Sequence, residues 1–264
     1  MCVWEELGGR GPDETKNLMR AFALLFGAFL VCAPAVQAQA GVFDSGLRFS
    51  DISPGTYQAG DTRFTLDRYQ NAFLMRYVGQ PEIFVLYANY GSMGVRVLQF
   101  DSGGTAIQVT GWGGMTAYTD DHPEGMPTAK VGDSTAPVLA AVSVAQIQGA
   151  ADDEAAHLTS SRGLKISIQA DQATLNEGAV RALAYDTLEN AARGIDRFTA
   201  NPAARNVFGQ RVTAVRIAIA DRPYIRIADK VLIVTFNPRT GYFGRASSKA
   251  ISFALGKMFG IPSN

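Results

Sequence analysis

The sequence predicts an α+β protein in which an N-terminal antiparallel β-meander, either a barrel or a sandwich, precedes a C-terminal α+β layer with a mixed or antiparallel sheet. Three observations favour this fold class. Glycine is frequent, at 27 of 264 residues, which suits many tight turns. The first half alternates strand-like segments with turn residues, and the second half combines a long amphipathic helix with further strand segments.

Residues 41–119 are expected to form the β-rich domain. Segments rich in β-branched and aromatic residues lie at 64–66, 72–78, 83–90, 94–100 and 105–112. In the last of these, Ile107 and Val109 alternate with Gln108 and Thr110, as in a strand with one wet face. Glycine-containing turns at 91–94 and 101–104 join neighbouring strands as hairpins.

Residues 120–141 are expected to be a linker and residues 142–264 an α+β domain. The stretch 119–137 has three prolines and no apolar period, which is typical of a loop. Helices are predicted at 143–161, 176–200 and 247–259, the second ending at Asn201-Pro202. Strands are predicted at 164–170, 212–220, 224–228 and 231–237, with Asp229-Lys230 as a hairpin turn.

The first 40 residues are predicted to be an artefactual extension followed by a cleaved secretory signal. Arg20 precedes the short apolar run AFALLFGAFLV at 21–31, and small residues follow it. Cleavage after Ala38 or after Ala40 fits equally well. The run is short for a membrane span, which needs about 20 residues, and a retained N-terminal anchor is the alternative.

Acidic residues before position 19 do not fit a signal, so Met19 is the expected start. The two cysteines, Cys2 and Cys32, both precede the predicted cut, and the mature chain would have no disulfide. Lipidation of Cys32 is disfavoured because Val31, not a small residue, precedes it. The predicted location is therefore the periplasm or the exterior, with no stable membrane span after cleavage.

Composition and motifs exclude several classes of function. The formal net charge is zero, so no basic excess exists to bind nucleic acid. His122 and His157 are the only histidines, and no metalloprotease, serine-hydrolase, nucleotide-binding or EF-hand motif is present. We therefore expect no cofactor and assign no catalytic residue. Whether the protein is an enzyme stays open, leaning towards no, because carboxylate chemistry needs only two acids at the right separation.

Four residues are candidates for ligand binding. Trp112 lies in the string Gly111-Trp112-Gly113-Gly114, where the ring could be a stacking platform for a sugar or aromatic ligand. A bulge that buries the indole explains the string better, so we expect Trp112 in the core. Arg96, Arg216 and Arg226 interrupt apolar strands and could bind an anion, although arginines on the wet face of a sheet account for them more simply.

The densest group of potential metal ligands is Asp120, Asp121, His122 and Glu124. Oxygen-rich loops bind calcium, and histidine with acids can bind zinc. The spacing matches neither kind of loop, and Pro123 and Gly125 are typical of a turn. We expect a solvated loop and no metal site.

Three segments resemble a known family: RVLQFDSGGTAIQVTGWGGMTAYTD at 96–120, LENAARGIDRF at 188–198 and RVTAVRIAIA at 211–220. They are similar to the domain of unknown function 4908, an uncharacterised family of exported alphaproteobacterial proteins. The resemblance implies export and supplies no catalytic residue.

The leading hypothesis is a non-catalytic binding or envelope-associated module that is exported. Its partner would be an envelope ligand or protein of unknown identity. The alternative is a carboxylate-dependent hydrolase acting on envelope glycans or peptides. Two carboxylates facing each other in a cleft would favour the enzyme, and an aromatic-lined hollow without paired acids would favour the binder.

Overall fold

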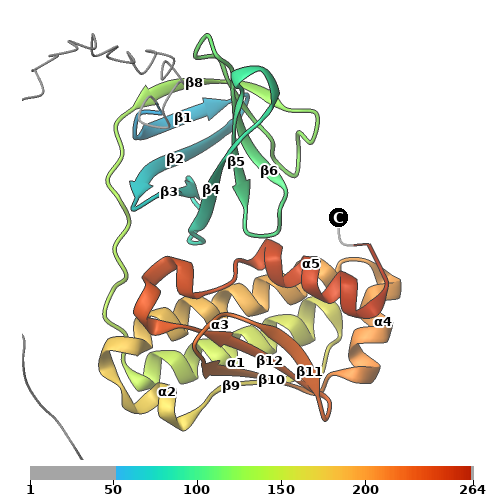
Figure 1. The fold of residues 1–264 in the computed structure, drawn as a ribbon. Coiled ribbons are helices and arrows are strands. Elements are labelled where there is room, and N and C mark those ends of the chain that lie inside the picture. Colours follow the sequence, from blue (N-terminus) through green and yellow to red (C-terminus); the bar gives the residue numbers. More distant parts are fainter. Residues whose placement is uncertain (1–51, 263–264) are drawn as a thin grey trace, which may run out of the picture. The chain divides into compact units, whose positions relative to one another are not determined.

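A computed structural model describes residues 52–262, which belong to one compact unit (Figure 1). The predicted signal, its cleavage sites, the start at Met19 and both cysteines lie outside these residues. None of the described helices has the length and apolar character that a bilayer crossing requires.

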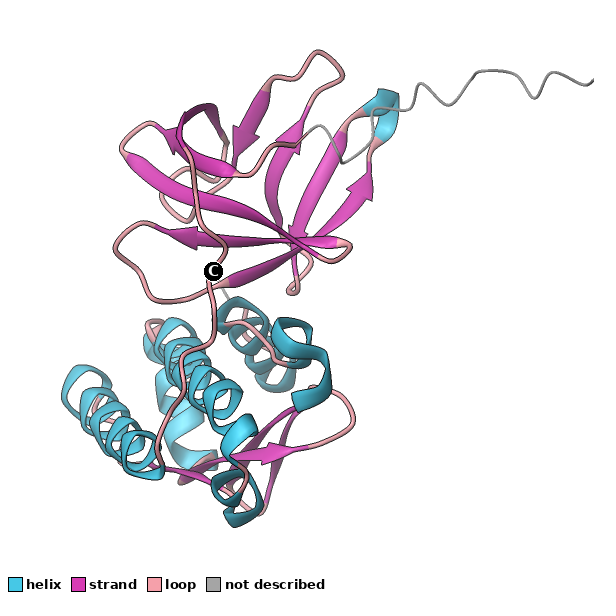
Figure 2. Cartoon of the chain, turned by 90° about the vertical axis from the view of Figure 1, so that its left-hand side faces the viewer, coloured by secondary structure: helices cyan, strands magenta, loops and turns pink. Residues whose placement is uncertain are grey.

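Eight antiparallel strands close into a barrel in the first half of the described chain (Figure 2). Each strand pairs with the next, and β1 pairs with β8 to complete the ring. The strands are β1 (Gly55–Ala59), β2 (Thr62–Tyr69), β3 (Ala72–Tyr77), β4 (Phe84–Tyr90), β5 (Arg96–Phe100), β6 (Thr105–Val109), β7 (Met115–Ala117) and β8 (Met126–Gly132). The predicted meander is confirmed in its barrel form.

Side chains fill the inside of the barrel. Alternate residues of each strand point inward, and an eight-stranded barrel is just wide enough for side chains to occupy its interior. Phe64, Phe84, Leu86 and Leu98 are fully buried there, and Phe84 packs edge-on against Phe100 with ring centroids 5.2 Å apart. A ligand of this lobe would therefore bind at an end of the barrel and not in its middle.

Strand β8 corrects the predicted linker. Residues 120–141 were expected to lack regular structure, yet Met126–Gly132 is the strand that closes the barrel on β1 and β7. The strand is mostly exposed on both faces and contains Pro127, so it carries no hydrophobic alternation that sequence could reveal. Backbone pairing with β1 and β7 holds the strand in place. The division into a β-rich and an α+β domain stays a prediction.

The second half is a four-stranded mixed sheet with helices, as predicted. Strand order is β11-β12-β10-β9, with β10 parallel to β9 and β12, and β11 antiparallel to β12. The strands are β9 (Ser167–Ala170), β10 (Ala214–Ile219), β11 (Ile225–Ala228) and β12 (Val231–Phe236). The helices are α1 (Val144–Arg162), α2 (Gln172–Asn176), α3 (Gly178–Thr199), α4 (Pro202–Arg211) and α5 (Ser248–Phe259), and short 3₁₀ turns lie at Ser92–Gly94 and Pro238–Gly244.

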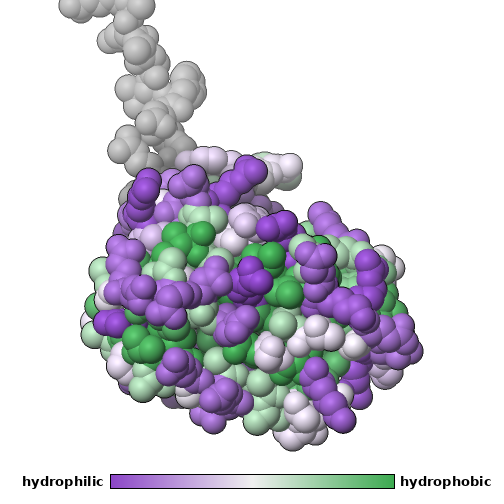
Figure 3. Space-filling model, turned by 90° about the horizontal axis from the view of Figure 1, so that it is seen from below, coloured by the Kyte–Doolittle hydropathy of each residue, from purple (hydrophilic) through white to green (hydrophobic). Residues whose placement is uncertain are grey.

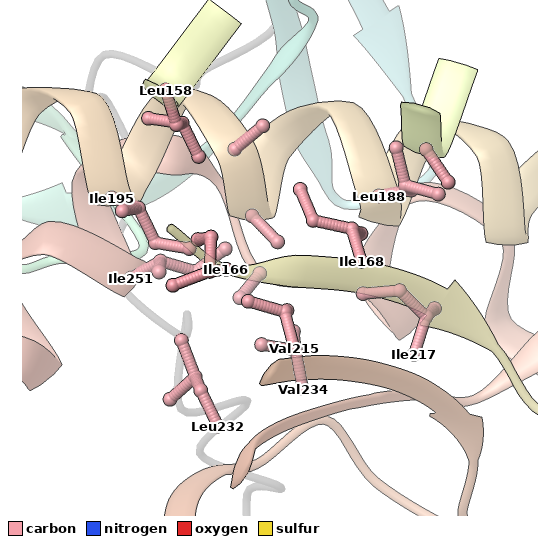
Figure 4. Close-up of a cluster of buried hydrophobic side chains, with 14 of the residues drawn as sticks. Leu158, Ile166, Ile168, Leu188, Ile195, Val215, Ile217, Leu232, Val234 and Ile251 are labelled. Carbon is pink, nitrogen blue, oxygen red and sulfur yellow. The ribbon is translucent and has the colours of Figure 1, made fainter. Parts of the chain in front are cut away.

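The core of this half lies between the sheet and helices α1 and α3. Figure 4 shows Leu158 of α1 and Leu188 and Ile195 of α3 above Ile168, Val215 and Val234 of the sheet. Ile251 of α5 joins the same cluster, because α5 packs on α3. The amphipathic period of α3 predicted this buried face correctly.

Local sequence explains where the helices begin and end. Ser143 and Gln146 form a reciprocal capping box at the start of α1, and Gly163 ends the helix in the left-handed conformation. Asn201 caps α4 by accepting hydrogen bonds from the amides of Ala203 and Ala204, with Pro202 in the first turn. The sequence reading took Asn201-Pro202 only as a stop and missed α4.

One segment of the second half covers the outside of the barrel. Ala72 and Leu74 of β3, Val85 of β4 and Ile83 just before β4 pack against Tyr242 of the turn Pro238–Gly244. The phenol of Tyr242 donates a hydrogen bond to the carbonyl oxygen of Pro137, 3.3 Å away. Strand β3 is consequently apolar on both faces, which explains its unbroken run Ala72–Met75.

Candidate functional site

The β6–β7 hairpin projects Trp112 from the barrel into solvent. The Thr110 amide donates to the Gly114 carbonyl oxygen at 2.9 Å, and the Gly113 amide donates to the Thr110 carbonyl oxygen at 3.0 Å. Gly113 has a φ of 86°, which the tight turn requires and a side chain would oppose. Trp112 is 96% exposed, so the expectation of a core tryptophan is wrong.

Beside Trp112 lies a hollow of about 540 Å³ at one end of the barrel, here called the barrel-end hollow. Its wall includes Trp112 and Met115 around the hairpin, and Lys130 of β8. Tyr57 of β1 and Arg96 of β5 also line it. The hollow therefore joins an exposed aromatic ring to two cationic side chains.

Arg96 lies inside the barrel end and not on a wet face. It shares the inward face of β5 with Leu98 and Phe100, and it is 2% exposed. The simpler explanation for Arg96, a solvated sheet face, is therefore wrong. Arg96 therefore lines the hollow from inside the barrel end, where burying a guanidinium is costly unless the group is paired.

The other lining groups make the hollow cationic and hydrogen-bonding. Burial raises the pKa of the Tyr57 phenol, which stays neutral and donates to the Ser53 carbonyl oxygen at 2.6 Å. Lys130 lies 3.4 Å from Asp133, a contact between two well-exposed side chains that water screens strongly. None of the described residues lining the hollow is acidic.

Arg216 and Arg226 lie together elsewhere, on the face of the sheet opposite α1 and α3. Arg216 of β10 and Arg226 of β11 both pair with Ile233 of β12, so they flank it two strands apart, about 10 Å between Cα atoms. Figure 3 looks from the side on which the sheet lies in Figure 1, and hydrophilic and hydrophobic side chains mix there.

These two arginines fit the wet-face explanation. Arg216 lies 3.7 Å from Asp171, and Arg226 lies over the ring of Tyr224 at 5.7 Å. The four candidate residues therefore form two separate pairs, Trp112 with Arg96 and Arg216 with Arg226. Trp112 and Arg96 line a common hollow.

A protein-family model described as a domain of unknown function, DUF4908, matches residues 41–255. The chain belongs to the DUF4908 family. The match spans both halves of the DUF4908 fold and ends inside α5. No curated protein and no solved structure matches the chain.

Sequence reasoning missed a set of acidic side chains in the DUF4908 chain that bind the first turn of α5. These acids and their partners are here called the α5 anchor. Asp101 accepts hydrogen bonds from the Ser247 amide at 2.7 Å and the Ser247 hydroxyl at 2.5 Å. Glu82 accepts from the Ser248 amide at 2.8 Å and the Ser248 hydroxyl at 2.7 Å. Negative charge is stabilising at a helix N-terminus, which presents unpaired amides.

Burial raises the pKa of both Glu82 and Asp101, although the serine hydrogen bonds and nearby arginines oppose the rise. The physical cause is the cost of holding a charged carboxylate away from water. No local motif marks these contacts, because the partners are 146 and 166 residues apart in the chain.

Asp120 completes the α5 anchor. It binds Lys249 of α5 and accepts a hydrogen bond from Arg197 of α3 at 2.6 Å. Partial burial opposes its ionisation, but the hydrogen bonds from Lys249 and Arg197 prevail and hold its pKa below the usual value. Asp120 is thus an ion-pair partner within the loop expected to be solvated, and no metal-binding group of three or more residues occurs between 52 and 262.

Proposed function

We propose that this DUF4908 protein is an exported, envelope-associated binding protein without catalysis, whose barrel-end hollow binds an acidic saccharide. The observation that carries the proposal is the pairing of a nearly fully exposed Trp112 with a buried Arg96 in one hollow. A large aromatic ring held in water by a tight hairpin contributes little to folding, so its value lies in contact with a ligand.

The chemistry of the lining favours a negatively charged ligand with an apolar face. The indole of Trp112 offers a flat surface on which a sugar ring can stack. Lys130 offers a charged donor to a carboxylate, the buried Arg96 adds positive charge to the wall, and Tyr57 and Thr128 supply hydroxyl groups. None of the described lining residues is acidic, so none of them would repel an anionic ligand.

The carboxylate-dependent hydrolase is the weaker alternative. Glycoside hydrolysis by this route needs two carboxyl groups flanking the scissile bond. Glu82 and Asp101, two buried carboxyls with raised pKa, each accept a hydrogen bond from a serine of the α5 anchor. These contacts give both acids a structural role in holding α5. The barrel-end hollow has no acid among its described lining residues and therefore favours binding over hydrolysis.

Titration calorimetry with tri-galacturonate, using maltotriose as the neutral control, tests the binding proposal. Trp112→Ala should weaken tri-galacturonate binding at least tenfold, which corresponds to about 1.4 kcal/mol. Tyr224→Ala, which removes an exposed aromatic ring just before β11, should leave binding unchanged.

The stability of the Trp112 variant distinguishes a role of this side chain in ligand binding from a role in core packing. Because Trp112 is 96% exposed, Trp112→Ala should change the unfolding free energy by less than about 0.5 kcal/mol. A loss of about 3–5 kcal/mol would instead indicate a core residue. Equal binding of both trisaccharides, or unchanged binding by the Trp112 variant, would reject the acidic-saccharide proposal.

The export part of the proposal has its own test. Mass spectrometry of the protein recovered from its cells should find an N-terminus at Gln39 or Gly41. A species that keeps residues 20–38 would overturn cleavage and favour a retained anchor.

A further inference from the structure

A second hollow, of about 440 Å³, lies away from the barrel-end hollow and is lined by side chains of both charge signs. Helix α3 contributes Arg193, Asp196 and Arg197, which share one helical face because they are three and four residues apart. Helix α1 contributes Glu154 and His157, spaced by three. The loop between β3 and β4 contributes Glu82. We call it the mixed-charge hollow.

Most charges of the mixed-charge hollow are fixed in position by partners behind them. Asp196 accepts two hydrogen bonds from Arg162, at 2.7 and 3.1 Å. Glu82 is only 3% exposed and is held by Ser248. These two acids therefore shape the wall and are not available as partners for a ligand ion.

The two arginines are fixed but keep donors to spare. Arg197 uses one guanidinium nitrogen on Asp120, and Arg193 uses two on Glu189 and Asn190. A guanidinium has five N–H donors, so each retains some for a carboxylate. A ligand that binds these arginines would lose little side-chain entropy, because the salt bridges already immobilise both side chains.

Glu154 is the complementary negative group. It is partly exposed, lines the hollow, and makes no hydrogen bond or ion pair with any residue between 52 and 262. Its carboxylate is therefore the one that can accept hydrogen bonds from an incoming ammonium group. His157, whose side chain is 56% exposed, lies on the same helix face one turn further on.

The balance of charge decides the class of ligand. Three carboxylates, two guanidinium groups and one imidazole line the wall, so both signs of charge are present. A ligand of a single sign would be attracted by one part of this wall and repelled by another. We propose that the mixed-charge hollow binds a zwitterion, an amino acid or short peptide whose ammonium group meets Glu154 and whose carboxylate meets Arg193 and Arg197. This site is independent of the barrel-end hollow.

Binding of L-alanyl-L-alanine, followed by calorimetry and by chemical shifts of the His157 ring protons, tests the proposal. The N-acetylated dipeptide lacks the ammonium group, and the dipeptide amide lacks the carboxylate. Each blocked peptide should bind at least tenfold more weakly than the free dipeptide. The His157 signals should shift only with the free dipeptide.

Glu154→Gln should weaken dipeptide binding at least tenfold without a change in melting temperature, since the side chain has no partner to lose. Asp153→Asn, the same change on an exposed neighbour outside the hollow, is the control and should bind normally. Trp112→Ala should also bind normally. Equal binding of free and blocked peptides, unchanged binding by Glu154→Gln, or no binding in the millimolar range would each overturn the proposal.

Discussion

The α5 anchor makes a quantitative prediction about two serines of one helix. Ser248 and Ser252 are both buried, at 0% and 3% exposure, and lie one turn apart in α5. The Ser248 hydroxyl donates to the buried carboxylate of Glu82 at 2.7 Å. The Ser252 hydroxyl has no hydrogen-bond partner among the described residues. Replacing each with alanine makes the same chemical change in two different environments.

Ser248→Ala should cost about 1.5–3 kcal/mol, the usual worth of a hydrogen bond to a charged group. For a protein of this size that lowers the melting temperature by about 3–12 °C. Ser252→Ala should be neutral or stabilising by up to about 1 kcal/mol, because it removes an unsatisfied buried hydroxyl and raises helix propensity.

Urea denaturation followed by circular dichroism measures both values under one set of conditions. Equal destabilisation by the two variants would refute the reasoning, since it would mean that the Glu82 contact adds nothing beyond the volume of the hydroxyl. In Ser248→Ala the pKa of Glu82 should also rise further, because that hydroxyl hydrogen bond lowers it in the wild type.

Two further predictions concern helix packing and acid stability. Gly194→Ala should destabilise the protein by about 1–3 kcal/mol, because the new Cβ would lie 2.7 Å from Ile251. Gly149→Ala should stabilise it by about 0.5–1 kcal/mol, because there is open space around that position. Thermal melts of the two variants measure both effects. Asp120 has a lowered pKa, so its contribution is present at neutral pH and is lost as pH falls below about 4. The difference between the urea midpoints of wild type and Asp120→Asn should therefore be largest at pH 7 and narrow as the pH falls below about 4. A difference that stays constant with pH would contradict the ion-pair assignment.

The sequence predicted the elements whose signal is local. The hairpin turn Asp229-Lys230 is confirmed, with both residues at positive φ, and the buried face of α3 follows its apolar period. Arg96 was misjudged although its signal was present, because it shares the parity of Leu98 and Phe100 and so points inward with them. Strand β8 carried no such signal.

The remaining features of the candidate sites could be recognised only from the folded structure. Trp112 lies in a turn, where the alternation of a strand no longer dictates which way a side chain points, and the glycine string was wrongly interpreted as a bulge that buries the indole. The α5 anchor and the mixed-charge hollow unite residues that are far apart in the chain. Their chemistry depends on which acids already have partners, and only coordinates reveal that.

The cover that Tyr242 provides for β3 and β4 has a consequence for truncated forms of the chain. The barrel strands are complete at Gly132, but Tyr242 follows about a hundred residues later. A barrel that closed without this segment would expose Leu74, Ile83 and Val85 to water. A fragment that stops before Pro238 would therefore keep an apolar surface uncovered and be prone to self-association.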